Sequence, residues 1–341
     1  DDNRVTGRHT LGGLLVDPVD GPRTGRVTIE DGLIVAVEED AAVPREPFIF
    51  PGFVDLHVYS PDALLEQGVT AYLLAAREPV ELPDERCVGL HLEGPFLNPD
   101  AAGAVPLDEI EPVDLERLAR WLEDAPVRIV TVAPEIPGGL DAIALVAERA
   151  VAAVGHTRAN GATVRAAIDA GARFATHLWN AMEPLGARET GPVAELLLDP
   201  RVVLGLIADG RHLHPRIEQL TIQVAGAERI ALTSDLVAKP VLGDNRLAGG
   251  DRAGAALVRR MARYGLREAA TMASLVPARL LGFADRGRVA AGHRADLAVL
   301  SPDLRPLETW VAGEIAWSVR YPQARTLDDL PPSTRAPGSG A

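Results

Sequence analysis

Acidic and imidazole side chains follow short apolar runs at several places in this 341-residue sequence. The residues in these positions are His57, Glu93, His156, His177, Asp209, His212 and Asp235. If the apolar runs are parallel strands, their carboxyl ends share one edge of a sheet, and the side chains converge there. A single histidine after a strand is usually a structural group, so the prediction of a reaction centre depends on their joint occurrence.

Glu93, His156 and His177 offer the ligand types of a catalytic metal site. Two imidazoles and one carboxylate supply three nitrogen or oxygen ligands and leave a coordination position for water. A divalent ion in such a site lowers the pKa of water from near 16 to about 7 and polarises a carbonyl group. The set therefore predicts hydrolysis assisted by a divalent metal. Zn²⁺ suits these ligands best, and Fe²⁺, Mn²⁺ and Co²⁺ are alternatives.

Asp235 follows the eighth predicted strand and is not needed as a metal ligand once Glu93, His156 and His177 are assigned. A carboxylate beside an activated water can accept its proton and return it to the leaving group. We therefore expect Asp235 to act as general base and then as general acid. His57, which ends the first apolar run, is an auxiliary candidate for the metal.

The elements that must position these residues are short apolar runs separated by amphipathic segments, a pattern typical of a parallel sheet buried on both faces. The predicted strands are Phe53–Val58, Val69–Ala75, Val88–Leu92, Arg128–Ala133, Ala150–Val154, Phe174–Thr176, Val202–Ala208 and Arg229–Thr233. Helices are predicted in most of the gaps between these strands, for example Leu115–Asp124, Leu140–Arg149, Ala162–Ala170, Arg216–Ala225 and Arg267–Leu281. Eight such units favour a closed (β/α)₈ TIM barrel of the α/β class. A doubly wound open sheet is the alternative, but no Gly-x-Gly-x-x-Gly turn follows the first strand.

Both ends of the chain have a different texture, with β-rich runs and turn signals at residues 9–48 and again at 295–314. They predict a small β-sandwich subdomain formed by the N- and C-terminal segments. The expected division is residues 1–49 for its first part, 50–285 for the hydrolase barrel and 286–330 for its second part. Residues 331–341 are rich in Pro, Ser and Gly, which predicts a flexible tail.

Bulk composition excludes several classes of function. A net charge of −14 provides no basic surface for nucleic acid or an anionic membrane. No apolar stretch reaches the roughly 18 residues that a membrane helix requires. One cysteine rules out an internal disulfide framework and suits a reducing compartment. We therefore expect a cytoplasmic protein that acts on a small molecule.

Longer motifs surround the candidate residues. They are Pro51-Gly52-Phe53-Val54-Asp55-Leu56-His57, Gly89-Leu90-His91-Leu92-Glu93-Gly94-Pro95-Phe96-Leu97, Ala175-Thr176-His177-Leu178-Trp179-Asn180-Ala181-Met182 and Ile207-Ala208-Asp209-Gly210-Arg211-His212. In these motifs the sequence resembles the N-acetylglucosamine-6-phosphate deacetylase family of the amidohydrolase superfamily. With Met272-Ala273-Ser274 and the closing Gly292-His293-Arg294-Ala295-Asp296-Leu297, the resemblance runs through nearly the whole chain.

The resemblance implies hydrolysis of N-acetyl-D-glucosamine 6-phosphate to D-glucosamine 6-phosphate and acetate. It gives the metal to Glu93, His156 and His177, and the proton transfer to Asp235. It also implies a homodimer, since relatives are commonly dimers.

The same resemblance implies a set of substrate contacts. Asn180 and Ala181 would hold the phosphate through amide groups, and Arg188 would pair with it. A guanidinium suits this role because its planar fork donates two parallel hydrogen bonds. His212 would contact the sugar or the acetyl oxygen.

The sequence also departs from the family pattern. Many relatives have a His-x-His pair for a second metal, but here Tyr59 follows His57 at that spacing, which favours one ion per subunit. Substrate segments are altered too, with Gly186-Ala187 in place of paired histidines. Two alternatives follow from these changes: another N-acyl substrate such as N-acetylgalactosamine 6-phosphate, or a non-catalytic relative that binds sugar phosphates.

Overall fold

The computed structural model describes residues 7–243 and 246–320, so the tail predicted at residues 331–341 lies outside the described residues. Contacts divide the chain into two compact units. Of the described residues, the terminal unit comprises 7–54, 62–71 and 253–320, and the central unit comprises 55–61 and 72–252 apart from 244–245. The domain limits expected from the sequence, at residues 49 and 285, stay a prediction.

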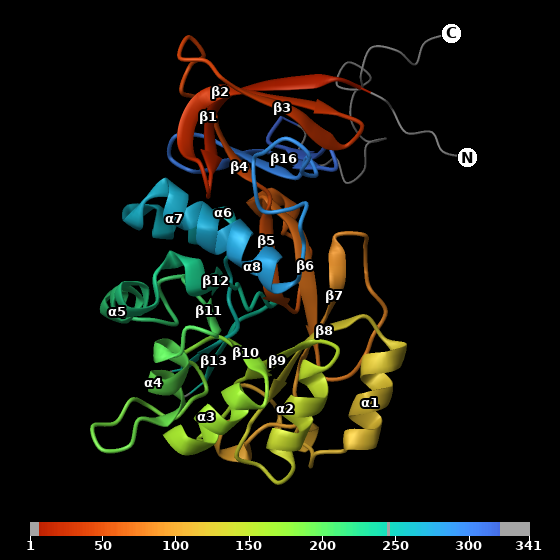
Figure 1. The fold of residues 1–341 in the computed structure, drawn as a ribbon, viewed down its shortest axis with the longest axis vertical. Helices are drawn as coiled ribbons and strands as arrows, with labels where there is room; N and C mark the ends of the chain where they lie inside the picture. The colour runs from red at the N-terminus through yellow and green to blue at the C-terminus, as the bar shows by residue number, and fades with distance from the viewer. Residues whose placement is uncertain (1–6, 244–245, 321–341) are drawn as a thin grey trace. The chain divides into compact units, whose positions relative to one another are not determined.

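The predicted barrel is present as an eight-stranded sheet in the order β12-β11-β10-β9-β8-β7-β6-β5, so spatial order follows chain order (Figure 1). Its strands are β5 (Phe53–Val58), β6 (Val69–Ala76), β7 (Cys87–Glu93), β8 (Val127–Val132), β9 (Val151–Val154), β10 (Ala172–Ala175), β11 (Val203–Leu206) and β12 (Ile230–Leu232). The two edges come together where Val58 pairs in parallel with Leu236 and the Tyr59 N–H donates to the Leu236 carbonyl at 2.9 Å. This near closure brings the end of the first strand beside the end of the last.

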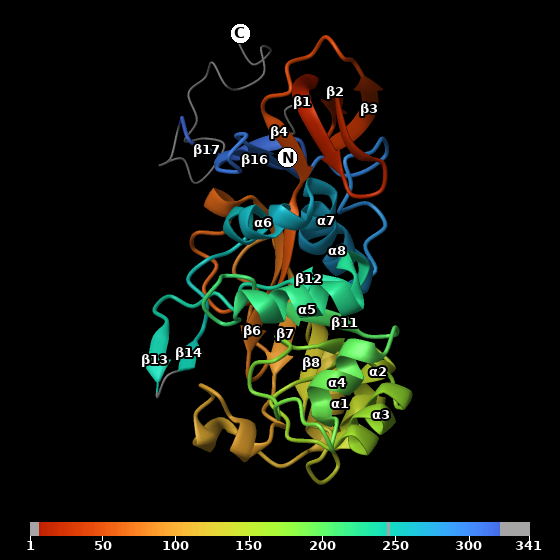
Figure 2. The same cartoon turned by 90° about the vertical axis from the view of Figure 1, so that its left-hand side faces the viewer.

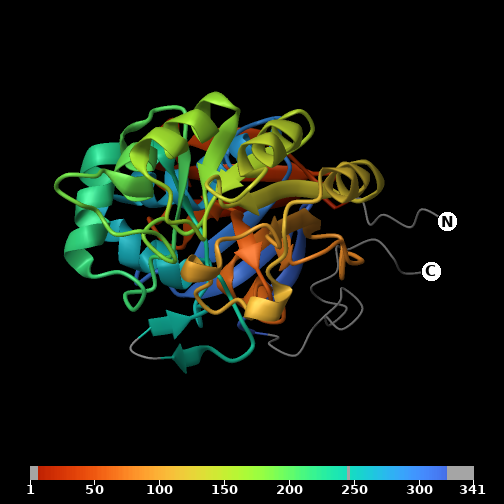
Figure 3. The same ribbon diagram turned by 90° about the horizontal axis from the view of Figure 1, so that it is seen from below.

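Five helices alternate with the later strands of the central unit. They are α1 (Leu115–Asp124), α2 (Gly139–Ala147), α3 (Gly161–Asp169), α4 (Gly191–Leu198) and α5 (Pro215–Ala225). Asp114 and Asn160 cap α1 and α3 by accepting hydrogen bonds from Arg117 N and Thr163 N. In Figure 3 these yellow-to-green helices lie around the strands, which explains why strands such as β8 are almost wholly buried.

Shorter elements complete the connections. The 3₁₀ segments are η1 (Leu65–Gln67), η2 (Pro99–Ala101), η3 (Leu107–Glu109) and η4 (Ala227–Arg229). The strands β13 (Val241–Gly243) and β14 (Arg246–Ala248) form an antiparallel hairpin that projects away from the eight-stranded sheet (Figure 2). Neither this hairpin nor α4 was expected from the sequence.

The terminal unit contains a seven-stranded sheet in the order β17-β16-β15-β4-β1-β2-β3. Its strands are β1 (His9–Asp17), β2 (Gly21–Glu30), β3 (Leu33–Glu39), β4 (Phe48–Pro51), β15 (Leu297–Leu300), β16 (Pro306–Val311) and β17 (Glu314–Ser318). One core joins both halves, with Leu15, Ile29 and Ile49 packed in the same cluster as Leu297 and Trp310. The expectation that the two chain ends form one β subdomain is confirmed.

The terminal unit also holds a run of helices, namely α6 (Ala255–Met261), η5 (Ala262–Tyr264), α7 (Leu266–Ala270), the π-helical turn η6 (Thr271–Leu275) and α8 (Val276–Leu280). The last three correspond to the single helix predicted at Arg267–Leu281. Within η6, Ser274 Oγ donates to the Pro51 carbonyl at the end of β4 (3.2 Å). Among the residues that the structure describes, no helix is both long and apolar enough to cross a membrane.

Candidate metal centre

The backbone turns sharply where three of the predicted site residues leave their strands. His156, His177 and Asp235 have φ angles of 48°, 31° and 50°, in the left-handed region that few non-glycine residues adopt. They follow β9, β10 and β12 within a few residues, so each turn ends a strand and redirects its side chain. Left-handed residues of this kind gather at functional sites, where the surrounding fold holds the strain.

Glu93, His156 and His177 form a compact, buried cluster. Glu93 Oε1 lies 3.0 Å from His156 Nε2 and 2.9 Å from His177 Nε2, and the two nitrogens are 3.2 Å apart. The three residues are only 4%, 4% and 5% exposed. Among the described residues they form a group whose ligand atoms all lie within 4.8 Å of one another.

Hydrogen bonding around these residues fits a divalent cation. His156 Nδ1 lies 3.0 Å from the Ala101 carbonyl, and a carbonyl can only accept, so this nitrogen carries the ring proton. His156 Nε2 faces Glu93 Oε1 at 3.0 Å: with a proton it donates to this carboxylate, and without one it can bind a metal ion. Burial acts to raise the pKa of Glu93, but the neighbouring imidazoles outweigh it and hold that pKa well below its usual value. Convergent lone pairs with a carboxylate charge are the donor set of a metal site.

His57 faces the same cluster. Its Nε2 lies 3.4 Å from Glu93 Oε1 and 3.4 Å from Asp235 Oδ1. Its Nδ1 lies 2.9 Å from Nδ1 of the buried His91. Burial lowers the pKa of His57 well below its ordinary value, so the ring is neutral, the form in which an imidazole binds a metal.

Asp235 is more accessible than the three ligands, with 15% of its side chain exposed. Burial, followed by the negative charge of Glu93, raises its pKa to about 7. A carboxyl group whose pKa lies near neutral pH can both take up and release a proton under physiological conditions. This is the property expected of the proton-transfer group.

The second oxygen of Glu93 contacts two residues that are not metal-ligand candidates, Tyr59 and Arg77. Tyr59 donates its hydroxyl proton to Oε2, and Arg77 Nη1 donates to the same oxygen at 2.8 Å. Arg77 also donates to the Tyr59 hydroxyl. The sequence prediction did not include Arg77, although it directly follows β6 and so satisfies the strand-end rule that selected the other site residues.

His91 lies in a buried chain of hydrogen bonds next to the cluster. Its Nδ1 lies 2.8 Å from the Leu56 carbonyl, and its Nε2 lies 2.8 Å from Thr131 Oγ1. Thr131 in turn lies 2.7 Å from Thr176 Oγ1, next to His177. These contacts fix the ends of β5, β7, β8 and β10 relative to one another.

Two of the expected substrate contacts, Asn180 and Ala181, lie in the turn that follows His177. The Asn180 N–H donates to the His177 carbonyl at 2.9 Å. The Ala181 carbonyl accepts from Thr157 N at 3.1 Å and so joins this turn to the segment after His156. Both residues are therefore held beside the metal cluster.

His212, the third expected contact, pairs with a neighbouring carboxylate. Its Nδ1 lies 2.8 Å from Asp209 Oδ2, and its Nε2 is buried without a hydrogen-bond partner among the described residues. Burial acts to raise the pKa of Asp209, but hydrogen bonds from His212 and two backbone N–H groups outweigh it and lower that pKa to about 2. The pair fixes the His212 ring and leaves Nε2 available to a ligand.

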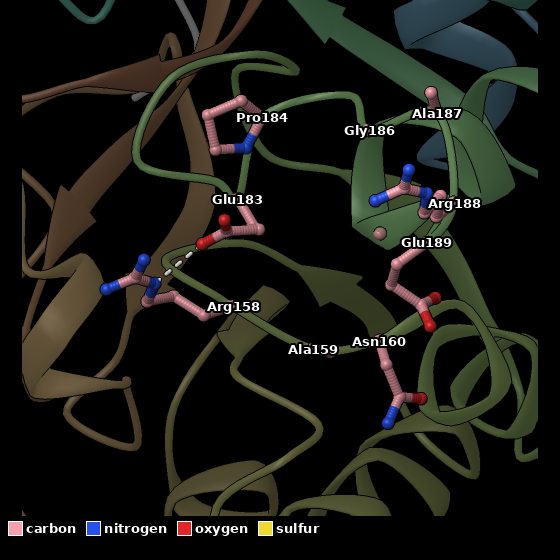
Figure 4. Close-up of a pocket in the computed structure, with 10 residues that line it drawn as sticks. Arg158, Ala159, Asn160, Glu183, Pro184, Gly186, Ala187, Arg188 and Glu189 are labelled. Carbon is pink, nitrogen blue, oxygen red and sulfur yellow. Dashed lines mark hydrogen bonds and ion pairs between the residues drawn. The ribbon is translucent and has the colours of Figure 1, made fainter.

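Arg188 lies apart from the metal ligands. It lines a cavity of about 620 Å³ together with Arg158, Asn160, Glu183 and Glu189, and this lining includes none of the predicted metal ligands (Figure 4). Arg158 is paired with Glu183 at 2.7 Å across the cavity from Arg188. Arg188 itself is exposed and makes no hydrogen bond or ion pair with any other residue in the described ranges.

Comparisons with known proteins agree with this arrangement. Residues 66–316 match the profile of the amidohydrolase family. The N-acetylglucosamine-6-phosphate deacetylase of Bacillus subtilis (strain 168) is 30% identical over 86% of this chain and 93% of its own length. The N-acetylgalactosamine-6-phosphate deacetylase of Escherichia coli O157:H7 is 31% identical over 85% of this chain and 94% of its own length.

Solved structures show the same likeness. A variant of the N-acetyl-D-glucosamine-6-phosphate deacetylase from Mycobacterium smegmatis, in complex with N-acetyl-D-glucosamine-6-phosphate, superposes with a TM-score of 0.82 at 30% identity. That match covers 92% of this chain and 100% of the other. The N-acetylglucosamine-6-phosphate deacetylase from Thermotoga maritima gives a TM-score of 0.82 at 29% identity, covering 91% and 100%.

Proposed function

The chain belongs to the amidohydrolase family, and from this premise we propose that it hydrolyses N-acetyl-D-glucosamine 6-phosphate to D-glucosamine 6-phosphate and acetate. Its relatives are hydrolases of amide C–N bonds, and so is this protein. The observation that carries the proposal is the convergence of Glu93, His156 and His177 next to Asp235. These residues combine a metal-ligand set with a carboxyl group that can transfer a proton.

Glu93, His156 and His177 would hold one divalent ion per chain, with His57 as an auxiliary neighbour. When bound there, the ion would polarise the amide carbonyl and make a water molecule acidic enough to attack at neutral pH. Zn²⁺ is the first choice for this ligand set, and Fe²⁺, Mn²⁺ and Co²⁺ share its preference for nitrogen and oxygen ligands.

Asp235 would move the proton. It accepts one from the attacking water as the carbon–oxygen bond forms, and it then delivers that proton to the amide nitrogen as the carbon–nitrogen bond breaks. The raised pKa of Asp235, about 7, supports both halves of this transfer. The products are an amine and acetate.

The remaining residues would position the sugar phosphate. Asn180 and Ala181 lie beside the metal ligands, where the side-chain amide of Asn180 and the backbone N–H of Ala181 would donate to the phosphate. Arg188 would add a bidentate ionic contact to the phosphate. It is able to do so because its side chain has no partner among the described residues. His212, fixed by Asp209, would use its open Nε2 to accept a hydrogen bond from a sugar hydroxyl or to donate one to the acetyl oxygen.

Acetate release from the zinc-loaded protein tests the proposal. The assay should compare N-acetyl-D-glucosamine 6-phosphate with N-acetylgalactosamine 6-phosphate, because relatives of both names are similar to this chain. Release of acetate mainly from the first supports the proposed substrate. If the metal-loaded protein releases acetate from neither substrate, the result would contradict the proposed deacetylation and favour a protein that only binds sugar phosphates.

Two further parts of the proposal concern the state of the protein in the cell. We propose a homodimer, which light scattering coupled to size-exclusion chromatography would test through the mass in solution. A cytoplasmic location is also proposed, because a single cysteine suits a reducing compartment. Cell fractionation would test it.

A further inference from the structure

The two carboxylate oxygens of Glu93 have different partners. Oε1 faces the imidazoles of His57, His156 and His177 at 2.9–3.4 Å. Oε2 accepts hydrogen bonds from Tyr59 and Arg77. Only Oε1 is therefore available to a metal ion in this arrangement.

We propose that Arg77 is a positioning residue which, together with Tyr59, occupies the second oxygen of Glu93 and limits this centre to a single metal ion. The inference rests on the proposed metal site. A two-metal hydrolase centre holds its ions about 3.5–4 Å apart, which requires shared or adjacent ligands. Here the oxygen that would reach a second ion already binds a cation that belongs to the protein.

The guanidinium of Arg77 is held firmly in this position. Nη1 donates to Glu93 Oε2 at 2.8 Å and to the Glu93 backbone carbonyl at 3.1 Å. On the outer side, Nε forms an ion pair with Glu109 Oε2 at 3.3 Å. The group also lies over the Tyr59 ring, 5.4 Å from its centre. Because a guanidinium does not lose its proton in proteins, its positive charge is permanent.

The rest of a second ion site is nearly assembled, which makes the arginine decisive. His57 Nε2 and Asp235 Oδ1 lie 3.4 Å apart, and His57 Nε2 has no hydrogen-bond partner within the described chain. His57 Nε2 also lies 3.4 Å from Glu93 Oε1, so Oε2 is the oxygen of this carboxylate that would have to bind a second ion while Oε1 binds the first. Arg77 occupies Oε2 and adds a permanent positive charge beside the cluster, which disfavours a second cation.

Tyr59 alone does not explain the limit to one ion. A tyrosine in place of a histidine removes one ligand, but it does not repel a cation. Arg77 does both, because it fills Glu93 Oε2 and carries a charge. The two residues can therefore be separated by mutation, and the arginine is expected to have the larger effect.

Metal stoichiometry tests this inference without relying on turnover. Wild-type protein and four variants (Tyr59→His, Arg77→Met, Tyr59→His/Arg77→Met and Arg77→Lys) would be equilibrated with excess Zn²⁺, desalted and measured by plasma mass spectrometry. We expect one ion per chain for wild type, Tyr59→His and Arg77→Lys, and close to two for the double variant. Arg77→Met is expected to exceed one. Loading with Mn²⁺ should give a strong spin-coupled electron paramagnetic resonance signal from the double variant, a weaker one from Arg77→Met, and none from wild type, Tyr59→His or Arg77→Lys.

Arg86→Met is the matched control, because Arg86 is similarly buried and pairs with Asp84 rather than with a metal ligand. It should bind one ion, like the wild type. Two ions in Tyr59→His, or only one in the double variant, would overturn the role of Arg77. A wild type that binds no ion, or that keeps its ion after Glu93→Gln, would instead refute the proposed metal site.

Discussion

At the scale of single residues, the chemistry depends on how each side chain divides its contacts. Glu93 gives one oxygen to the imidazoles and the other to Tyr59 and Arg77. His156 gives Nδ1 to a backbone carbonyl and Nε2 to the cluster. Such outer contacts fix the orientation of a metal ligand, and their loss commonly costs as much as 10–100-fold in affinity.

Asp235→Asn is expected to lower kcat by roughly 10²–10⁴-fold, the usual contribution of a general acid or base. Asn tolerates the left-handed backbone at this position, so the fold and the bound metal should be kept. Acetate release measures the first effect and metal content the second. Turnover at the wild-type rate would remove Asp235 from the mechanism, whereas loss of the ion would make it a ligand.

Arg188→Met should raise KM for the phosphorylated substrate by about 10–100-fold and leave kcat nearly unchanged. A hydrogen bond to a charged group contributes about 1.5–3 kcal/mol, and a phosphate contact of this kind is made equally in the ground state and the transition state. Arg158→Met is the matched control from the same cavity, because Glu183 already neutralises Arg158. Steady-state kinetics on both variants would decide. Equal effects of the two substitutions would contradict a specific phosphate contact.

Side-chain type and position predicted most of the residues that the structure brings together, since Glu93, His156, His177 and Asp235 are acids or imidazoles at strand ends. Arg77 was not predicted as a site residue, because the prediction was limited to metal ligands and acid–base groups and an arginine is neither. Its importance arises only from the pairing with Glu93, which lies 16 residues further along the chain.

At the scale of elements, the strands were the most predictable part. Continuous apolar runs mark strands buried on both faces, and β5 begins and ends at the predicted residues Phe53–Val58. Helix α4 was missed because nearly all of its residues are buried, so no polar face produces a helical period. The π-helical turn η6 was also not predicted, because it lies within a continuous helical segment and does not interrupt the apolar pattern of that segment.

The end of β1 provides a test of how the terminal unit is held together. Asp17 accepts hydrogen bonds from the backbone N–H groups of Val19 and Val289 and from Arg288, so it joins the first strand to a segment more than 270 residues away. Burial acts to raise the pKa of Asp17, but these hydrogen bonds outweigh it and lower that pKa below its usual value. The carboxylate therefore stabilises the folded state only while it is ionised.

Asp17→Asn is expected to lower the free energy of unfolding by about 1–3 kcal/mol at neutral pH, the cost of leaving buried donors poorly paired. Because the folded-state pKa is depressed, the stabilisation is present above the pKa of the unfolded state, near 4, and is lost as the pH falls through the folded-state value. Denaturant titrations at pH 7 and pH 3 would show the difference between variant and wild type shrink. A difference independent of pH would contradict the assignment, and the exposed Asp20 serves as control through Asp20→Asn.

At the scale of the whole molecule, composition predicted the broad class but not the division into units. A charge of −14 argued against a nucleic-acid surface, which stays a prediction, and the two β-rich ends indicated the one shared sheet that the structure has. The contact-based units do not follow from local pattern, because they depend on pairings such as β1 with β4 and β4 with β15. All of the proposed metal ligands belong to the central unit.

Metal removal should lower the thermal stability of the protein. An ion that binds only the folded state stabilises it by about 4 kcal/mol at a thousand times its dissociation constant. Differential scanning calorimetry with and without a chelator should therefore show a drop of several degrees in Tm. Glu93→Gln, which weakens the site, should show a much smaller drop, and an equal drop in both proteins would indicate a metal bound elsewhere.

The left-handed turns at His156 and His177 also imply a trade-off between activity and stability. A sequence selected for stability alone would place Gly, Asn or Asp at these positions, because other residues there cost roughly 1–3 kcal/mol each. The metal-free His177→Asn variant should therefore unfold at a higher temperature than the metal-free wild type, although it loses a ligand. A lower unfolding temperature would show that packing of the imidazole outweighs the backbone strain. In this chain the residues that would perform the reaction are also places where the fold gives up stability.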